Sequence, residues 1–332
     1  MRKRNMVVLS LLCIFGLLLC IFASISLGAK TIGFEEIIQG ISGSLEDSFE
    51  AKVVRARIPR TVFGLLAGAA LSVSGALMQA VTRNPIADPS ILGVNTGASL
   101  FVVCGISFLH IDNGNQYIWL AFLGASLTAV FVYGLASAGY GGATPLKLAL
   151  AGAAAGTALQ SLVNTVMLPR SQVMDRFRFW QVGSIGGASW EDIRLMLPYL
   201  AVGFLLAFCL APSLNTLALG DETATGLGLH VTRVRALSAL AGVLLCAAST
   251  ALAGPIGFVG LMIPHLMRIF LGPDMRYILP FSAVGGGCLL LLADVAGRLL
   301  GRPGELESGI VTALAGAPVF LFIIRKVKVR AI

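Results

Sequence analysis

Histidine and cysteine, the side chains most often used for catalysis and metal binding, are not arranged for chemistry in this sequence. The three histidines, His110, His230 and His265, lie far apart, and neither a metal-binding HExxH nor a nucleophile-bearing GxSxG sequence occurs. The six cysteines all fall within apolar stretches and form no CxxC pair, which is typical of small buried hydrophobic residues. No lysine follows a glycine, so the phosphate-binding GxxxxGK loop is missing. The sequence thus predicts no catalytic residue, no metal site and no ATP hydrolysis by that route.

Arginine is the residue type whose placement does suggest a chemical role. The segment 52–60 reads KVVRARIPR, and Arg298 closes the sequence ADVAGR in a distant part of the chain. A guanidinium binds a carboxylate through two parallel hydrogen bonds, so Arg57, Arg60 and Arg298 are suited to an acidic partner. Alternatively, the same side chains snorkel to lipid headgroups. The residues alone leave both interpretations open.

The elements that position these arginines are long and apolar. The chain has 332 residues, of which 57% are hydrophobic and 12% charged, with a mean hydropathy of +0.88, whereas soluble domains carry about 25% charged residues. A helix of about 20 apolar residues spans a bilayer, and these stretches are too long and uniform for barrel strands. We therefore expect an all-α polytopic membrane protein, a single transmembrane domain over 1–332 with ten transmembrane helices. The ten stretches are roughly 6–27, 62–81, 91–109, 116–137, 148–168, 195–211, 236–253, 255–267, 277–293 and 309–324.

The distribution of charge predicts the orientation. With the N-terminus in the cytoplasm and ten crossings, the inner ends carry a net charge of +9 and the outer ends −1, which agrees with the total of +8. Lysine and arginine concentrate on the cytoplasmic side of membrane proteins, so both termini are expected there. The basic balance does not indicate nucleic acid, because no basic patch is interleaved with aromatic residues.

The apolar stretches themselves contain no Asp or Glu, and Asp294 comes nearest, at an outer helix end. Ion-coupled transporters usually carry an ionisable residue at mid-membrane, so we expect the energy for transport to come from another polypeptide. A self-contained secondary transporter is the rival interpretation, since broken helices and small residues suit either class. The segment ALAGAAAGTA at 149–158 predicts close helix packing, at a subunit interface or along a pore near 148–168.

Prolines and loops give further local predictions. Pro59 and Pro255 are each expected to start a helix, because a proline at the first position loses no hydrogen bond. Arg268, in GPIGFVGLMIPHLMR (254–268), would complement a helix C-terminus, with His265 beside it in a structural role. The segment 212–235 predicts a short helix plus a turn, either a linker or a helix docked on a cytoplasmic partner. The segment 82–90, TRNPIADPS, predicts a rigid turn.

Four ordered motifs resemble one known family. They are ARIPRTVFGLLAGAALSVSGALMQAVTRNPIADPSILGV, GPIGFVGLMIPHLMR, LPFSAVGGGCLLLLADVAGR and GIVTALAGAPVF, and the similarity covers about 55–326. The chain resembles the FecCD-type permeases, the membrane subunits of ATP-binding-cassette importers for ferric siderophores, vitamin B12 and haem. The resemblance implies ten helices per subunit and a bacterial cytoplasmic (inner) membrane location. A ferric siderophore is the favoured cargo because most of the family carries one, with vitamin B12 and haem as alternatives.

The resemblance also implies the partners. They are a second permease subunit, as a copy or a paralogue, two ATPase subunits that hold ATP and Mg, and an extracytoplasmic binding protein. No cofactor is expected on this chain itself.

The family's functional residues carry over by motif. Arg57, Arg60 and Arg298 are implied to meet acidic residues of the binding protein. At 305–309 the family's E-x-P-x-G is ELESG, with Glu307 in place of proline, which adds negative charge near Arg298. The implied ATPase-coupling residues are Leu217, Leu219, Gly220, Asp221, Glu222, Ala224, Leu227 and Gly228. The implied cytoplasmic gate consists of Asn84, Pro85, Ile86, Thr144 and Pro145.

Overall fold

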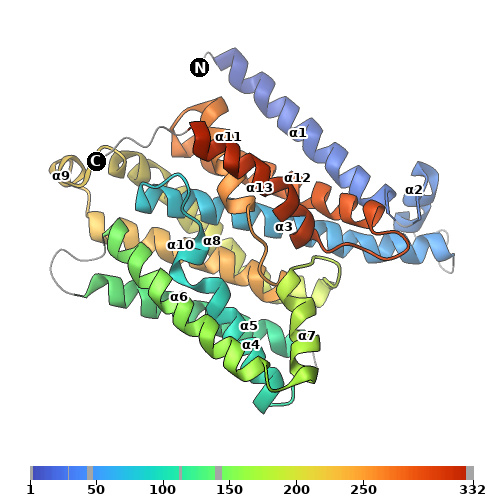
Figure 1. Cartoon of the computed structure of the whole chain (residues 1–332). Coiled ribbons are helices and arrows are strands. Elements are labelled where there is room, and N and C mark those ends of the chain that lie inside the picture. Colours follow the sequence, from blue (N-terminus) through green and yellow to red (C-terminus); the bar gives the residue numbers. More distant parts are fainter. Residues whose placement is uncertain (1–2, 29, 43–47, 112–113, 139–143, 327–332) are drawn as a thin grey trace.

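Helices form every regular element in the part of the chain that the structure describes. The computed structural model describes residues 3–28, 30–42, 48–111, 114–138 and 144–326, and no strand occurs in them. The elements in chain order (Figure 1) are α1 (Lys3–Ser26), α2 (Phe34–Ser42), α3 (Phe49–Thr82), the short 3₁₀ helix η1 (Pro89–Leu92), α4 (Val94–Phe108), α5 (Gly114–Ser137), α6 (Pro145–Met167), α7 (Ser171–Val182), α8 (Trp190–Leu217), α9 (Asp221–Gly226), α10 (Val231–Ala253), α11 (Val259–Leu271), α12 (Met275–Leu300) and α13 (Ser308–Lys326).

Seven of these helices are long and apolar enough to cross a membrane, namely α1, α3, α5, α6, α8, α10 and α12. Three shorter apolar helices are α4, α11 and the Ser308–Leu321 part of α13. Together they fall on the ten predicted apolar stretches, so the all-α membrane class is confirmed. Ten complete crossings and cytoplasmic termini stay predictions.

Helix α3 is the central element, packed against α8, α10, α11 and α12. Glycine allows the close approach at two crossings. A β-carbon at Gly68 would lie 2.3 Å from the carbonyl oxygen of Gly286 on α12, and one at Gly75 would lie 2.0 Å from that of Gly260 on α11. Small residues let helix backbones meet in this way. The centre of the bundle is therefore held by backbone-to-backbone contact.

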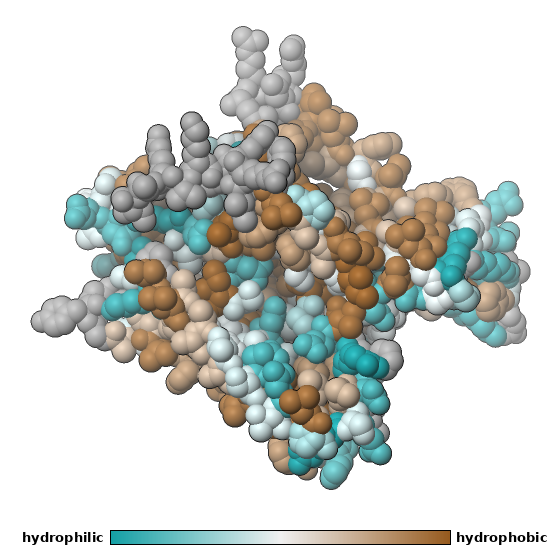
Figure 2. All heavy atoms as spheres, viewed as in Figure 1, coloured by the Kyte–Doolittle hydropathy of each residue, from teal (hydrophilic) through white to brown (hydrophobic). Residues whose placement is uncertain are grey.

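The outer helices expose apolar side chains, as a lipid environment requires. Leu18 of α1 is 60% exposed and Leu314 of α13 is 69% exposed. Helix α1 lies along the edge of the bundle and contacts mainly α12 and α3. Figure 2 shows hydrophobic residues over much of the visible face and hydrophilic ones towards its two side ends and its lower end.

Two predicted helix starts are wrong. Helix α3 begins at Phe49, where the Ser48 side chain accepts the Ala51 N–H at 3.1 Å, and Pro59 lies inside it. The extra turns form because they bury Val54 against α2. Helix α11 begins at Val259 instead of Pro255, because Phe258 with φ +68° interrupts the helical backbone. Helices α2 and α7 lie outside the ten apolar stretches and were not predicted.

The predicted helix and turn within 212–235 is present as α9. Its neighbours are longer than expected, because α8 continues past Pro212 to Leu217 and α10 already begins at Val231. The connection between the two long helices is therefore 218–230.

Candidate functional site

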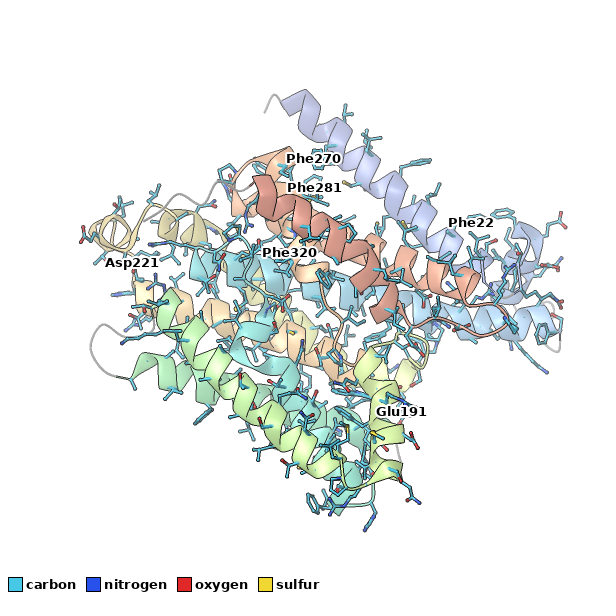
Figure 3. All side chains as sticks on the ribbon, viewed as in Figure 1. Phe22, Glu191, Asp221, Phe270, Phe281 and Phe320 are labelled. Atoms are coloured by element: carbon cyan, nitrogen blue, oxygen red, sulfur yellow. The ribbon has the colours of Figure 1, made fainter. Side chains whose placement is uncertain are left out.

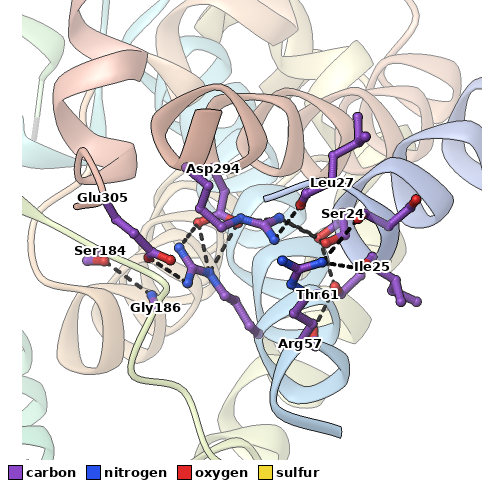
Figure 4. Close-up of polar contacts among 12 residues, drawn as sticks. Ser24, Ile25, Leu27, Arg57, Thr61, Ser184, Gly186, Asp294 and Glu305 are labelled. Carbon is purple, nitrogen blue, oxygen red and sulfur yellow. Dashed lines mark hydrogen bonds and ion pairs between the residues drawn. The ribbon is translucent and has the colours of Figure 1, made fainter. Parts of the chain in front are cut away.

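The packing of α3 against α12 brings the three predicted docking arginines together (Figure 4). Arg60 donates from Nη2 to Oδ1 of Asp294 at 2.7 Å and from Nη1 to Oε2 of Glu305 at 2.8 Å. Arg298 pairs with the other carboxylate oxygen of Asp294 at 3.0 Å. We call Arg57, Arg60, Arg298, Asp294 and Glu305 the arginine cluster; formally it carries three positive and two negative charges.

Arg57 and Arg298 hold the end of α1. Arg57 donates to the carbonyl oxygens of Ile25 at 2.7 Å and Lys30 at 2.8 Å. Arg298 donates to those of Ser24 at 2.9 Å and Leu27 at 2.8 Å. The last carbonyls of a helix have no partner within it and carry partial negative charge. The two guanidinium groups supply the missing donors and fix α1 to α3 and α12.

Burial differs sharply within the arginine cluster. Arg57 is 8% exposed and both Arg298 and Asp294 are 1% exposed, whereas the Glu305 side chain is 44% exposed. The donors of Arg57 and Arg298 are thus directed within the chain, and Arg60 is the member in contact with an exposed carboxylate. Sequence reasoning gave Asp294 and Glu305 no role, although the i,i+4 spacing of Asp294 and Arg298 favours a helical ion pair. Binding of an external partner by the arginines stays a prediction.

The predicted coupling residues lie at the opposite end of the bundle, in and around α9 (Figure 1). Figure 3 shows Asp221 there, far from Glu191 at the start of α8. Leu219 and Leu227 are 63% and 65% exposed. By contrast, Leu217 and Ala224 are fully buried, Glu222 is exposed, and Gly220 and Gly228 have positive φ angles on either side of α9. The two exposed leucines that flank this short helix form a surface suited to a partner protein.

The predicted gate residues belong to two helix boundaries. Asn84 accepts the Ile86 N–H at 3.1 Å, which closes the turn that also contains Pro85 and follows α3. Thr144 caps α6 by accepting the Lys147 N–H at 3.3 Å, and Pro145 is the first residue of that helix. In the described residues no hydrogen bond joins the two segments.

Arg83 connects the Asn84 turn to α9. Its Nη2 donates to the carbonyl oxygen of Leu217 at 2.7 Å and contacts the Asp221 carboxylate, which also receives Arg235 of α10 at 3.0 Å. Sequence reasoning assigned no role to Arg83 or Arg235. The sequence offers no signal for this contact, because 138 positions separate Arg83 from Asp221.

Helix α6 presents a polar face to the outside of the chain. Thr157, Ser161 and Asn164 are exposed at helical spacing, and Gln160 donates to the Asn164 side chain at 3.2 Å. They line an open groove of about 570 Å³ that also includes Ser90. Exposed amides are costly in hydrocarbon. This face therefore suits a protein partner or an aqueous path better than lipid.

No group of three or more metal-binding side chains occurs in the described part of the chain.

The fold is shared with a solved structure of an inward-facing metal-chelate type ABC transporter. The match has a TM-score of 0.82 at 26% identity and covers 95% of this chain and 97% of that one.

Three curated relatives are similar over most of their length. The ferric enterobactin transport system permease FepD of Escherichia coli is 40% identical over 93% of both chains. The Fe(3+)-citrate import system permease YfmD of Bacillus subtilis is 42% identical over 98% of this chain and 95% of its own. The cobalamin import system permease BtuC of Halobacterium salinarum is 38% identical over 83% of this chain and 74% of its own.

The sequence model of the FecCD transport family matches residues 16–326, almost the whole chain. This chain is a multi-pass membrane permease that belongs to the FecCD transport family.

Proposed function

We propose that this chain is the permease subunit of an ATP-binding-cassette importer that passes a ferric siderophore into the cytoplasm. Family membership over residues 16–326 carries the proposal, and the names of two similar permeases refer to iron chelates. The protein would reside in a bacterial cytoplasmic membrane and hydrolyse no ATP itself. ATP and Mg would be held by two partner ATPase subunits.

The polar face of α6 supports a second permease subunit as partner, either a copy or a paralogue. Thr157, Ser161 and Asn164 need a polar neighbour within the membrane. Pairing two such faces would enclose a hydrophilic path, along which an iron chelate could pass without meeting lipid.

The two ends of the bundle support two further partners. Leu219 and Leu227 beside α9 would seat in the ATPase, and the turns at Asn84–Ile86 and Thr144–Pro145 would gate the path. An extracytoplasmic binding protein would dock at the arginine cluster. Its carboxylates would reach Arg60 first by replacing Glu305, whose side chain is 44% exposed, while Arg57 and Arg298 are buried and bonded within the chain.

Uptake of labelled cargo tests the proposal. A deletion strain and its complemented parent are compared under iron limitation with ferric siderophores, cobalamin and haem. Selective loss of one ferric siderophore is expected. Selective loss of cobalamin or haem uptake would overturn the assignment of a ferric siderophore as cargo and would still support an importer. Uptake that survives loss of the ATPase but collapses with an ionophore would favour the secondary transporter instead.

A further inference from the structure

Arg83 occupies the point where the gate turn meets the coupling region. It follows α3 in the left-handed conformation, with φ of 50°, directly before Asn84. Its guanidinium bonds the carbonyl oxygen of Leu217, the last residue of α8, and the carboxylate of Asp221, the first residue of α9. One side chain thus bridges both ends of the connection 218–220.

The Asp221 carboxylate has a second partner in different surroundings. Arg235 of α10 donates to the same oxygen at 3.0 Å, and its side chain is 8% exposed, against 36% for Arg83 and 44% for Asp221. The Arg235 contact is therefore the fixed side of the arrangement. The Arg83 contact faces solvent, so it contributes little to the stability of the fold and its geometry can adjust while the contact is kept.

The backbone around this contact permits movement of α9 as a unit. Gly220 has φ +112° and Gly228 has φ +82°, so each end of the helix carries a residue with few steric restrictions. The turn after Arg83 is in contrast closed on itself by the Asn84 side chain, which accepts the Ile86 N–H. A displacement of Arg83 is therefore expected to move the turn at 84–86 as a unit.

We propose that Arg83 and Asp221 are positioning residues that transmit the movement of α9 to the gate turn at 84–86. The inference rests on the proposed function, in which Leu219 and Leu227 beside α9 seat in the ATPase, so that a movement of the ATPase would carry α9 with it. Arg83 suits this role because the two N–H groups of Nη2, held in the guanidinium plane, bond two acceptors at once, which a rotating lysine ammonium does with less geometric control. Arg233 of α10, two residues before Arg235, is exposed and has no ion pair among the described residues, which makes it a matched control for Arg83.

The test uses the complete importer, with its ATPase subunits and binding protein, in proteoliposomes. Uptake and ATP hydrolysis are measured on the same vesicles for Arg83→Gln, Asp221→Asn, the double variant and the control Arg233→Gln. Each of the first two is expected to keep its ATPase rate within about twofold and to transport about fivefold less per ATP hydrolysed, the lower range of coupling effects. The double variant is expected to transport as much per ATP hydrolysed as the single variant with the larger loss, because both residues act through one contact. Arg83→Lys is expected to recover part of the loss.

Three results would overturn the inference. Transport per ATP equal to that of Arg233→Gln would show that the contact transmits nothing. Additive losses in the double variant would show that the two residues act separately. Loss of ATPase co-purification in Asp221→Asn, with normal transport in Arg83→Gln, would assign Asp221 to docking. A wild-type complex without ATP-dependent uptake would instead refute the proposed function.

Discussion

The two ends of α3 carry the same chemical pair, arginine with aspartate, in opposite surroundings. Asp294 in the arginine cluster and Asp221 at the start of α9 are each bonded by two arginines, but Asp294 is 1% exposed whereas the Asp221 side chain is 44% exposed. Breaking a buried pair leaves an uncompensated charge, while an exposed pair opens into water. The comparison teaches that one contact fixes the fold of α1, α3 and α12, and that the other is suited to a part that moves.

The largest effect is expected for Asp294→Asn. Loss of the carboxylate leaves Arg60 and Arg298 buried against each other, so the free energy of unfolding should fall by about 3–5 kcal/mol. Thermal unfolding of the purified protein in detergent measures this, together with its level in the membrane. Glu305→Gln is the control, because its exposed pair contributes at most about 1 kcal/mol. Equal losses of unfolding free energy in both variants would show that the buried Asp294 and the exposed Glu305 contribute alike to stability.

A smaller and local effect is expected for Arg57→Gln. The end of α1 loses the donors to the carbonyl oxygens of Ile25 and Lys30, and this end can separate without unfolding the rest of the bundle. Backbone amides over residues 22–32 should then exchange with deuterium faster, while α10 is unaffected. Arg55→Gln, an exposed arginine of the same helix, serves as control. Unchanged exchange would mean that lipid and α12 alone hold α1.

At the other end, Arg83→Gln is expected to change stability little, because Arg83 and Asp221 are both partly exposed and Asp221 keeps its contact with Arg235. An exposed ion pair contributes about 0–1 kcal/mol and is screened by salt. Thermal unfolding at low and high salt should show a small shift that shrinks as salt is added. A loss as large as that of Asp294→Asn would refute the view that this exposed contact contributes little to stability.

The smallest effect concerns Asp274, which caps α12 at the same end. Hydrogen bonds from Arg276 and then from Asn215 hold the pKa of the Asp274 carboxyl below its ordinary value. A lowered folded-state pKa gives stability that is present at neutral pH and is lost as the pH falls below the ordinary value of about 3.9. Unfolding between pH 7 and pH 3 should therefore depend less on pH in Asp274→Asn. The same pH dependence in both proteins would contradict this assignment.

The sequence predicts the apolar helices well because lipid imposes one requirement on all of them, a long run without charge. It does not predict α2 or α7, because neither lies in such a run. The prediction that Arg57, Arg60 and Arg298 act together rested on family motifs, and no rule of sequence spacing could have supplied it. Asp294 was visible beside Arg298, yet its burial depends on α3, which lies more than 200 positions away. Tertiary packing alone decides whether such a charge is buried.

The length of α3 has a consequence for how a displacement at one end of the protein reaches the other end. Its 34 residues make a rod of about 51 Å, with Arg57 and Arg60 towards one end and Arg83 directly after the other. Between them, the rod touches neighbouring backbones at Gly68 and Gly75, contacts too close for any larger side chain. Such a strut is poorly compressible. A displacement of α3 along its axis at Arg83 then also displaces Arg60. The two ends of the protein therefore move together.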